Sequence, residues 1–215
     1  MFQRKEIGCL IQEKQPKKYD LVYYLRVFFM DVKKAIEKRR AFRSLKKVKV
    51  TKDLIYDLAE SARLSCSCFN NQPWRYVFVY NKEKLDEMKD VLSKGNEWAY
   101  DASMIIVVCA RKDDDCVIYN REYYLFDTGF ATGFLVLRAT ELGLVAHPIA
   151  GYSPKKTRKV LGIPDDMQVI TLVIVGKHSK EINPVLSDKQ KEAEKKRPER
   201  KNFEDFVFFN TYKGD

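Results

Sequence analysis

The sequence YNREYYLFDTGFATGFLVLRATEL, at residues 119–142, is the longest stretch of the chain with the apolar periodicity of a helix. Its interior holds four small residues that would let another backbone approach closely: Gly129, Ala131, Gly133 and Ala139. Gly143 follows directly, and glycine readily adopts the left-handed conformation that ends a helix. This stretch therefore predicts one long helix with close packing along it.

Shorter patterned segments lie on both sides of this helix. Apolar stripes, several of them after a capping residue, predict four further helices: Val32–Arg40 after Asp31, a helix from Thr51 to Ala62, Lys82–Leu92, and Lys155–Leu161 after Ser153 and Pro154. Apolar runs rich in β-branched or aromatic residues predict three strands: Arg75–Tyr80, Met104–Ala110 and Met167–Gly176. Ser65–Pro73 predicts a loop and His147–Tyr152 a turn. Helices interleaved with three or four strands indicate an α+β or α/β domain.

Length and composition indicate one globular domain. The chain has 215 residues, of which 45% are apolar and 13% aromatic, enough to bury a sizeable core. No apolar run approaches the roughly 18 residues that cross a bilayer. Met1–Gln15 is polar and lacks the apolar centre of a signal peptide. We therefore expect no membrane partner.

The positive charge is concentrated near the N-terminus. The chain has 40 basic and 30 acidic residues, and residues 1–50 hold 15 of the basic and 5 of the acidic ones. The remainder is therefore balanced, at 25 against 25. This asymmetry suggests an anionic partner such as nucleic acid, a membrane surface or a phosphorylated cofactor, and the alternative is a solvated basic face without a specific partner.

The chain has five cysteines, an odd number: Cys9, Cys66, Cys68, Cys109 and Cys116. Cys66 and Cys68 are the only close pair in the sequence, and a lone Cys-x-Cys lacks the second pair that a zinc site needs. Cys109 falls in a predicted buried strand and is interpreted as a small apolar residue. The acidic run Asp113–Asp115 is interpreted as a solvated loop rather than a metal site. This cysteine usage predicts a protein of the reducing cytoplasm that holds no metal.

The common catalytic motifs are absent from the sequence. It has no Gly-x-Ser-x-Gly elbow, His-Glu-x-x-His helix, Walker loop or Gly-x-Gly-x-x-Gly fingerprint. The two histidines lie in a predicted turn, at His147, and after a predicted strand, at His178. An enzyme with this sequence would leave the hard chemistry to a cofactor.

Three segments fit one another as parts of one cofactor site. Arg39-Arg40-Ala41-Phe42-Arg43 carries three guanidinium groups, which bind phosphate through bidentate hydrogen bonds; alone, the cluster could instead complement its own helix dipole. Ser65–Trp74 offers hydroxyl and amide groups suited to the polar edge of a heterocycle. Pro148-Ile149-Ala150-Gly151 is a small-residue turn whose backbone N–H groups could face a planar ring.

These segments occur in an order that resembles the FMN-dependent nitroreductase superfamily over roughly Met30 to Tyr212. The resemblance is carried by a set of short matches: Arg-Arg-x-x-Arg at 39–43, Ser-x-x-Asn-x-Gln-Pro-Trp at 67–74, the Gly-containing helix at 127–142, Gly-Leu-x-x-x-Pro-Ile-x-Gly at 143–151, Leu-Gly-Ile-Pro at 161–164, Val-Gly-Lys at 175–177 and Arg-Lys-x-Phe-Glu-Asp-Phe-Val at 200–207. Each match alone is weak, and their order makes the resemblance specific. It implies an α+β fold in which helices flank a central mixed, mostly antiparallel sheet. It also implies an intertwined homodimer with one FMN at each interface.

The resemblance assigns a role to each matched residue. Arg39 and Arg43 would hold the FMN phosphate and ribityl chain, with Arg40 and Ala41 beside them, and Arg200 and Lys201 would approach the phosphate from the C-terminal arm. Ser67, Asn70 and Gln72 would bind the ribityl chain or the pyrimidine edge. Pro148, Ile149, Ala150 and Gly151 would cover the ring, with a backbone N–H near the flavin N5. No side chain is assigned a catalytic role and no metal is expected.

The chain departs from the family's pattern at three matched positions. Ala41 stands where many members have Ser, Cys66 where Pro is frequent, and Asn202 where Pro is frequent. Each departure affects a single expected contact, and together they do not change the expectation that the cofactor is FMN. The resemblance divides the chain into residues 1–29, an extension without an assigned role, residues 30–187, the FMN-binding domain, and residues 188–215, a C-terminal arm.

The arm ends in aromatic residues that its own polar composition cannot bury. Asp188–Lys201 has almost no apolar surface, and the next residues are strongly apolar: Phe203, Phe206, Val207, Phe208 and Phe209. The resemblance supplies a surface for them, because the arm would dock on the partner subunit and bring Arg200 to a cofactor site at the interface.

The resemblance predicts a cytoplasmic FMN oxidoreductase that takes hydride from NADH or NADPH. The acceptor would be a nitroaromatic, a quinone or another small electron-poor molecule. Relatives in the superfamily also perform dehalogenation, flavin fragmentation and peptide-heterocycle oxidation, which remain alternatives within the class. An alternative of another class is a basic nucleic-acid-binding module that keeps the fold, with Tyr23, Tyr24, Phe28 and Phe29 stacking bases; it is disfavoured because no recognised motif for it is present.

Overall fold

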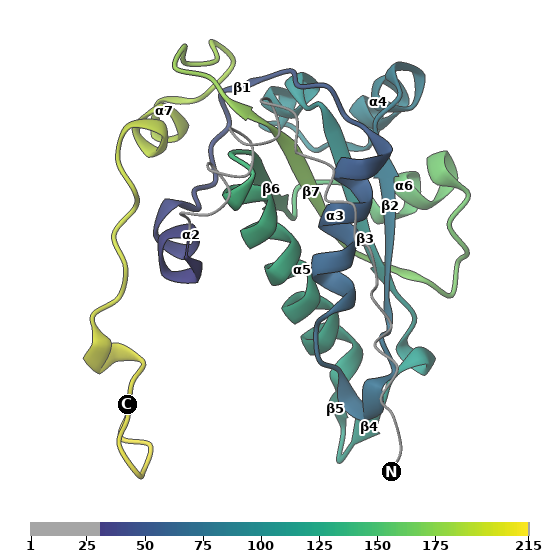
Figure 1. Cartoon of the computed structure of the whole chain (residues 1–215), viewed down its shortest axis with the longest axis vertical. Helices are drawn as coiled ribbons and strands as arrows, with labels where there is room; N and C mark the ends of the chain where they lie inside the picture. Colours follow the sequence, from purple (N-terminus) through teal and green to yellow (C-terminus); the bar gives the residue numbers. More distant parts are fainter. Residues whose placement is uncertain (1–30, 215) are drawn as a thin grey trace, which may run out of the picture.

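A five-stranded sheet forms the centre of the computed structural model, which describes residues 31–214 (Figure 1). The strands follow the order β1 (Leu45–Lys46), β7 (Gln168–His178), β3 (Met104–Ala110) and β2 (Trp74–Val79), and β6 (Val145–Ile149) also pairs with β7. Every strand pairing in the described residues is antiparallel. The predicted α+β fold with a mostly antiparallel sheet is thereby confirmed.

Helices cover both faces of this sheet (Figure 1). The helices α3 (Lys52–Arg63) and α5 (Tyr123–Glu141) pack on one face, and α4 (Lys82–Met88) and α6 (Pro154–Leu161) pack on the other. The short helix α2 (Val32–Lys38) lies against α5. The remaining elements are short: α7 (Asp188–Lys195), the hairpin strands β4 (Val117–Ile118) and β5 (Arg121–Glu122), and 3-10 turns at Cys68–Asn70, Lys89–Val91, Glu97–Asp101, Lys112–Asp114 and Phe203–Asp205.

The central strand β3 is buried along its whole length and separates two hydrophobic clusters. Successive strand residues point to opposite faces, so Ile105 and Val107 join the cluster under α4 and α6, while Ile106 and Val108 join the cluster under α3 and α5. Cys109 belongs to the first cluster and is fully buried, as predicted for a small apolar residue. Burial raises its pKa to about 11, so the thiol stays protonated.

The predicted helix caps are confirmed at three sites. Side-chain oxygens of Asp31, Thr51 and Ser153 each accept a hydrogen bond from the backbone N–H three residues later. These caps satisfy N–H groups that a helix start leaves without an internal partner.

Two segments differ from their predicted structure. The long helix begins at Tyr123 rather than Tyr119, because Tyr119 and Asn120 take positive φ angles of 49° and 66° in the turn between β4 and β5. Pro148 and Ile149 belong to strand β6 and not to a turn, because they pair with Val173 and Leu172 of β7.

The polar arm contains an ordered helix that its composition did not predict. Ser187 and Gln190 form a reciprocal capping box at the start of α7, and the buried Glu194 near its end ties the helix to the domain. No helix among the described residues combines the length and apolarity needed to cross a membrane.

Several sequence expectations fall on residues 1–30, outside the part of the chain that the structure describes. They are the extension at 1–29, Cys9, and the aromatic residues Tyr23, Tyr24, Phe28 and Phe29. The alternative of a nucleic-acid-binding module depended on those four aromatic residues.

The cluster beneath α5 predicts the cost of a core substitution. Leu135 is fully buried on the sheet-facing side of α5, so Leu135→Ala should lower the free energy of unfolding by about 2–5 kcal/mol through lost burial and a residual cavity. Denaturant unfolding at fixed protein concentration measures this change. The control Leu125→Ala, on the same helix but 40% exposed, should change it much less, and equal losses would contradict the packing described.

Candidate functional site

The arginines after α2 line a cleft with residues from the C-terminal arm. α2 ends at Lys38, and residues 39–43 run from its end to β1. The cleft has a volume of about 360 Å³, and we call it the cationic cleft; its lining residues are Arg39, Arg40, Ala41, Arg43, Lys189, Gln190, Ala193, Arg197, Pro198 and Arg200. The structure therefore brings together five predicted site residues, while Lys201 lies outside the lining.

The six cationic side chains of this cleft form no ion pair with any described residue. Burial lowers the pKa of Arg39, and the charges of Arg197 and Arg200 lower it further. Burial also lowers the pKa of Arg43. All these guanidinium groups remain charged, since arginine titrates far above neutral pH. Six cationic side chains beside the buried carboxylate of Glu194 leave an excess of positive charge, which suits a multiply charged anion such as a phosphate.

Glu194 holds this cleft together from beneath. Its side chain is buried, and its two carboxylate oxygens accept hydrogen bonds from the backbone N–H groups of Arg43 at 2.7 Å and Ser44 at 3.1 Å. In return, a nitrogen of the Arg40 guanidinium donates to the backbone carbonyls of Ala193 and Glu194. These contacts join residues about 150 positions apart and fix α7 beside the arginine turn.

Arg197 closes the other side of the cleft. One nitrogen of its guanidinium donates to the carbonyl oxygens of Glu37 and Arg39, at the C-terminal end of α2. The carbonyls at a helix end lack internal partners, so this arginine caps α2 from the opposite end of the chain. Sequence reasoning missed Arg197, Lys189 and Glu194, and the only signal was the density of charge in residues 188–201.

His147 supports the arginine turn from the core. Its ring stacks on Trp98 with 4.9 Å between ring centroids, and Nδ1 lies 3.2 Å from the carbonyl oxygen of Phe42. Burial lowers the pKa of His147 to about 4, so the ring is neutral at pH 7, and Nδ1 must carry the proton that it donates to this carbonyl.

Arg39 lines a second cavity as well as the cationic cleft. This second cavity has a volume of about 440 Å³ between α5, β3, β6 and β7, and we call it the small-residue cavity; its lining residues are Arg39, Val108, Thr128, Gly129, Thr132, Gly133, Val136, Pro148, Ile170 and Thr171. A side chain added at Gly129 or Gly133 would meet open space, so these glycines leave room that larger residues would fill. Thr128 Oγ1 is buried and lacks a hydrogen-bond partner among the described residues.

The four residues predicted to cover the flavin ring, Pro148 to Gly151, do not all face the same cavity. Pro148 lines the small-residue cavity, whereas Ile149 is buried in the opposite hydrophobic cluster. Gly151 packs against Asn96, whose side-chain nitrogen donates to the Gly151 carbonyl oxygen, and a Cβ at Gly151 would require the end of the Asn96 side chain to move. Ala150 between them is exposed.

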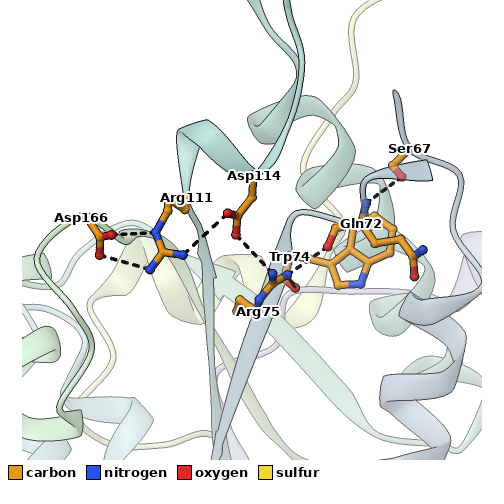
Figure 2. A network of polar contacts seen from close by, with 7 residues as sticks. All are labelled: Ser67, Gln72, Trp74, Arg75, Arg111, Asp114 and Asp166. Atoms are coloured by element: carbon orange, nitrogen blue, oxygen red, sulfur yellow. Dashed lines mark hydrogen bonds and ion pairs between the residues drawn. The ribbon is translucent and has the colours of Figure 1, made fainter. Parts of the chain in front are cut away.

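The predicted polar loop at 67–72 has an unusual backbone. Phe69, Asn70 and Gln72 take positive φ angles of 47°, 59° and 51°, which non-glycine residues seldom adopt. Such strain persists only where surrounding contacts enforce it, and it is concentrated at functional sites. The Ser67 hydroxyl accepts the Gln72 backbone N–H at 3.0 Å, so the loop closes on itself (Figure 2).

An arginine and acidic network anchors the end of this loop (Figure 2). Arg75 donates to the backbone carbonyls of Gln72 and Trp74, at 3.0 and 2.9 Å, and pairs with Asp114 at 3.2 Å. Arg111 extends the network by bonding Asp166 at 2.7 Å and lying 3.6 Å from Asp114. The Gln72 side chain points away from this network in Figure 2, and its Nε2 donates to the Asn70 carbonyl oxygen at 3.1 Å.

Cysteine pairing in this loop differs from the sequence interpretation. The structure joins Cys68 to Cys116 in a disulfide across 48 positions, whereas Cys66 is free and exposed. The sequence did not predict this pair, and the reducing compartment inferred from the cysteines stays a prediction. Their proximity depends on tertiary folding that sequence spacing does not reveal.

The two halves of the predicted site lie at opposite ends of the sheet in one chain. The polar loop precedes Trp74, which pairs with Ala110, and Ala110 pairs with Gln168 at the start of β7. The arginine turn precedes Leu45, which pairs with His178 at the end of β7. Ten residues of extended strand separate these two ends by about 33 Å. A single chain therefore does not bring Ser67, Asn70 and Gln72 to the cationic cleft.

Comparison with known proteins identifies the family. The sequence model of the Nitroreductase family matches residues 36–97 and 92–177. The chain belongs to the nitroreductase family. The match spans the arginine turn, the polar loop, α5 and β6, so the geometry described above is that of a nitroreductase-family oxidoreductase.

Individual relatives agree with this assignment. A protein of Archaeoglobus fulgidus, provisionally named an NADH dehydrogenase or NAD(P)H nitroreductase, is 30% identical over 147 residues, which cover 66% of this chain and 83% of the relative. An NADH dehydrogenase of Thermus thermophilus is 25% identical over 186 residues, covering 72% and 90%. The crystal structure of an oxidoreductase containing FMN superposes with a TM-score of 0.75 at 25% identity, covering 87% of this chain and 96% of that one.

The buried His147 predicts a loss of stability in acid. Its pKa falls from 6.5 to about 4 on folding, so the unfolded chain binds the proton first as the pH decreases. The contribution of neutral His147 to the free energy of unfolding is fully present above pH 6.5. This contribution should decrease by about 3 kcal/mol as the pH falls towards 4. Unfolding free energies of wild type and His147→Phe, measured from pH 7 to pH 4, isolate this contribution. A variant with the same pH slope as wild type would contradict it.

Proposed function

We propose that this nitroreductase-family chain binds FMN and uses it to pass electrons from NADH or NADPH to a nitroaromatic, a quinone or another small electron-poor acceptor. The observation that carries the proposal is the junction at Arg39 between the cationic cleft and the small-residue cavity. FMN has a dianionic phosphate at one end and a planar ring at the other. The two cavities, which share Arg39 as a lining residue, match these two chemical halves.

The residues present fit the cofactor at both ends. The cationic cleft has unpaired guanidinium groups for a phosphate, with Arg39 and Arg43 as the two predicted contacts. The small-residue cavity presents Pro148 and the glycines of α5 to a ring, and the Thr128 hydroxyl still lacks a partner. Bound FMN would supply hydride chemistry at the ring. This chain's residues would hold the phosphate, orient the ring and exclude water, so no side-chain nucleophile is needed.

We infer a homodimer whose second copy completes the site. The polar loop and the cationic cleft of one chain are too far apart to share a ligand, and the partner's loop would supply the second set of contacts. An exposed apolar face is available for such an interface: Phe126, Phe130 and Phe134 of α5 are each at least 39% exposed, beside Val32 and Leu64. Exposed patches of this kind mark protein interfaces.

The C-terminal tail fits the same arrangement. Phe203, Phe206 and Phe209 are 74%, 56% and 84% exposed, and the segment after α7 runs away from the sheet (Figure 1). In a dimer this tail would dock on the partner, where its aromatic side chains would be removed from water.

Arg43→Ala should weaken FMN binding without a comparable loss of folding. Removal of one charge-assisted phosphate contact costs about 1.5–3 kcal/mol, or roughly ten- to a hundredfold in affinity. Flavin absorbance of the purified protein and titration with FMN measure the effect. Lys38→Ala, a cation on α2 that does not line the cleft, is the matched control. An Arg43→Ala protein that titrates like wild type would show that this arginine is not a phosphate contact, and a wild type without flavin affinity or NAD(P)H oxidation would refute the proposed function.

Truncation after Lys201 should damage dimerisation and FMN retention together. The truncated chain loses the exposed aromatic tail but keeps every strand of the sheet and α7. Sedimentation velocity combined with flavin absorbance measures both properties in one sample. A truncated protein that remains dimeric and yellow would mean that the tail packs only locally.

A further inference from the structure

Two sulfur atoms and two carboxylates meet at a place that the proposed function does not use. Cys68 lies in the polar loop, Asp115 and Cys116 lie between β3 and β4, and Asp127 lies in the first turns of α5. Within the described residues, Cys68, Asp115 and Cys116 form the cluster whose ligand atoms all lie within 4.8 Å of one another. Three segments far apart in the sequence thus place soft and hard ligands at one point.

The carboxylates of this cluster lack a cation. Asp115 Oδ1 accepts hydrogen bonds from the Asn71 side chain at 3.2 Å and from the Cys116 N–H at 2.8 Å, whereas Oδ2 is buried without a partner. Asp127 is only 4% exposed and accepts the Cys68 N–H at 2.6 Å. No ion pair among the described residues reaches either carboxylate, so a bound cation would be the first positive charge in contact with them.

We propose that the reduced form of this cluster binds one Zn²⁺ ion through Cys68 Sγ, Cys116 Sγ and a carboxylate oxygen of Asp115. Two sulfur ligands and one oxygen favour zinc over magnesium or calcium, which require oxygen ligands. Tetrahedral zinc bonds of about 2.0–2.3 Å place neighbouring ligand atoms roughly 3.3–3.8 Å apart, which the cluster's spacing can accommodate by side-chain rotation. The fourth position is open to water.

Asp127 is a positioning residue for this ion. Its carboxylate holds the Cys68 backbone N–H, and this contact orients the loop that presents the thiol. Outer contacts of this kind fix the direction of a ligand and strengthen the site.

The disulfide is the oxidised alternative to the metal site. An external thiol or phosphine supplies the electron pair that breaks the Cys68–Cys116 bond, and each sulfur takes up one proton. Binding of Zn²⁺ then releases both protons as two zinc–sulfur bonds form. Either cross-link ties the strained polar loop to the segment before β4. The inference rests on the cluster's geometry alone and does not depend on FMN binding.

Cobalt titration of the full-length reduced protein tests the inference. The protein is first reduced with a phosphine, and the phosphine is then removed under anaerobic conditions. The reduced protein is titrated with Co²⁺. The ligand-field absorption of tetrahedral, thiolate-bound Co²⁺ lies at longer wavelengths than flavin absorption, so bound flavin does not interfere. We expect one Co²⁺ per chain, displaced by Zn²⁺, and no such absorption from the oxidised protein.

Three variants separate the cluster from adventitious binding. Cys116→Ser should abolish the thiolate–cobalt absorption, and the nearly isosteric Asp115→Asn should weaken Zn²⁺ binding at least tenfold. Cys66→Ser, which removes the exposed thiol two positions from Cys68, should bind like wild type. Circular dichroism confirms that each variant is folded. Reduced wild type without the absorption, or a signal that Cys66→Ser removes and Cys116→Ser keeps, would overturn the inference.

Discussion

The register of β7 determines where every part of the site can lie. This strand of 11 residues pairs with β3 along most of its length, with β6 near its middle and with β1 at its end. Because all three neighbours are antiparallel and buried on at least one face, a slip by one residue would turn apolar side chains out of both clusters. The arginine turn and the polar loop are thereby fixed at the two ends of one strand.

Each end is then completed by contacts that the sheet itself does not provide. Glu194 and Arg197 fasten the C-terminal arm to the arginine turn, and this arrangement gathers six cationic side chains in one cleft. At the other end, the Arg75 network and the Cys68–Cys116 link hold a loop with three left-handed residues. These two well-supported half-sites, at opposite ends of one chain, are the reason that we propose a second copy of the chain at each site.

Sequence reasoning found the local features and missed the distant ones. Caps at Asp31, Thr51 and Ser153 and the buried run of β3 follow from spacing over a few residues, and all were predicted. Pro148 was misplaced in a turn, because only its pairing with β7 reveals a strand. Residue chemistry singled out the arginines and the polar loop, and the family resemblance assigned their roles toward FMN.

The residues that sequence reasoning missed act over long separations. Glu194 reaches Arg43 across 151 positions and Cys68 reaches Cys116 across 48, and no periodicity connects such pairs. The polar composition of α7 predicts that its charged residues face solvent, and only the tertiary structure shows that Glu194 is buried.

A mixed dimer tests most directly whether two chains share each site. One chain carries Arg43→Ala and the other carries Gln72→Ala, and two affinity tags isolate the mixed species. If each site combines the cleft of one chain with the loop of the other, one site of the mixed dimer has both substitutions and the other has none. The account predicts about half of the wild-type flavin content and activity, well above either homodimer, because one of two sites is intact. A mixed dimer as empty as the homodimers would contradict it.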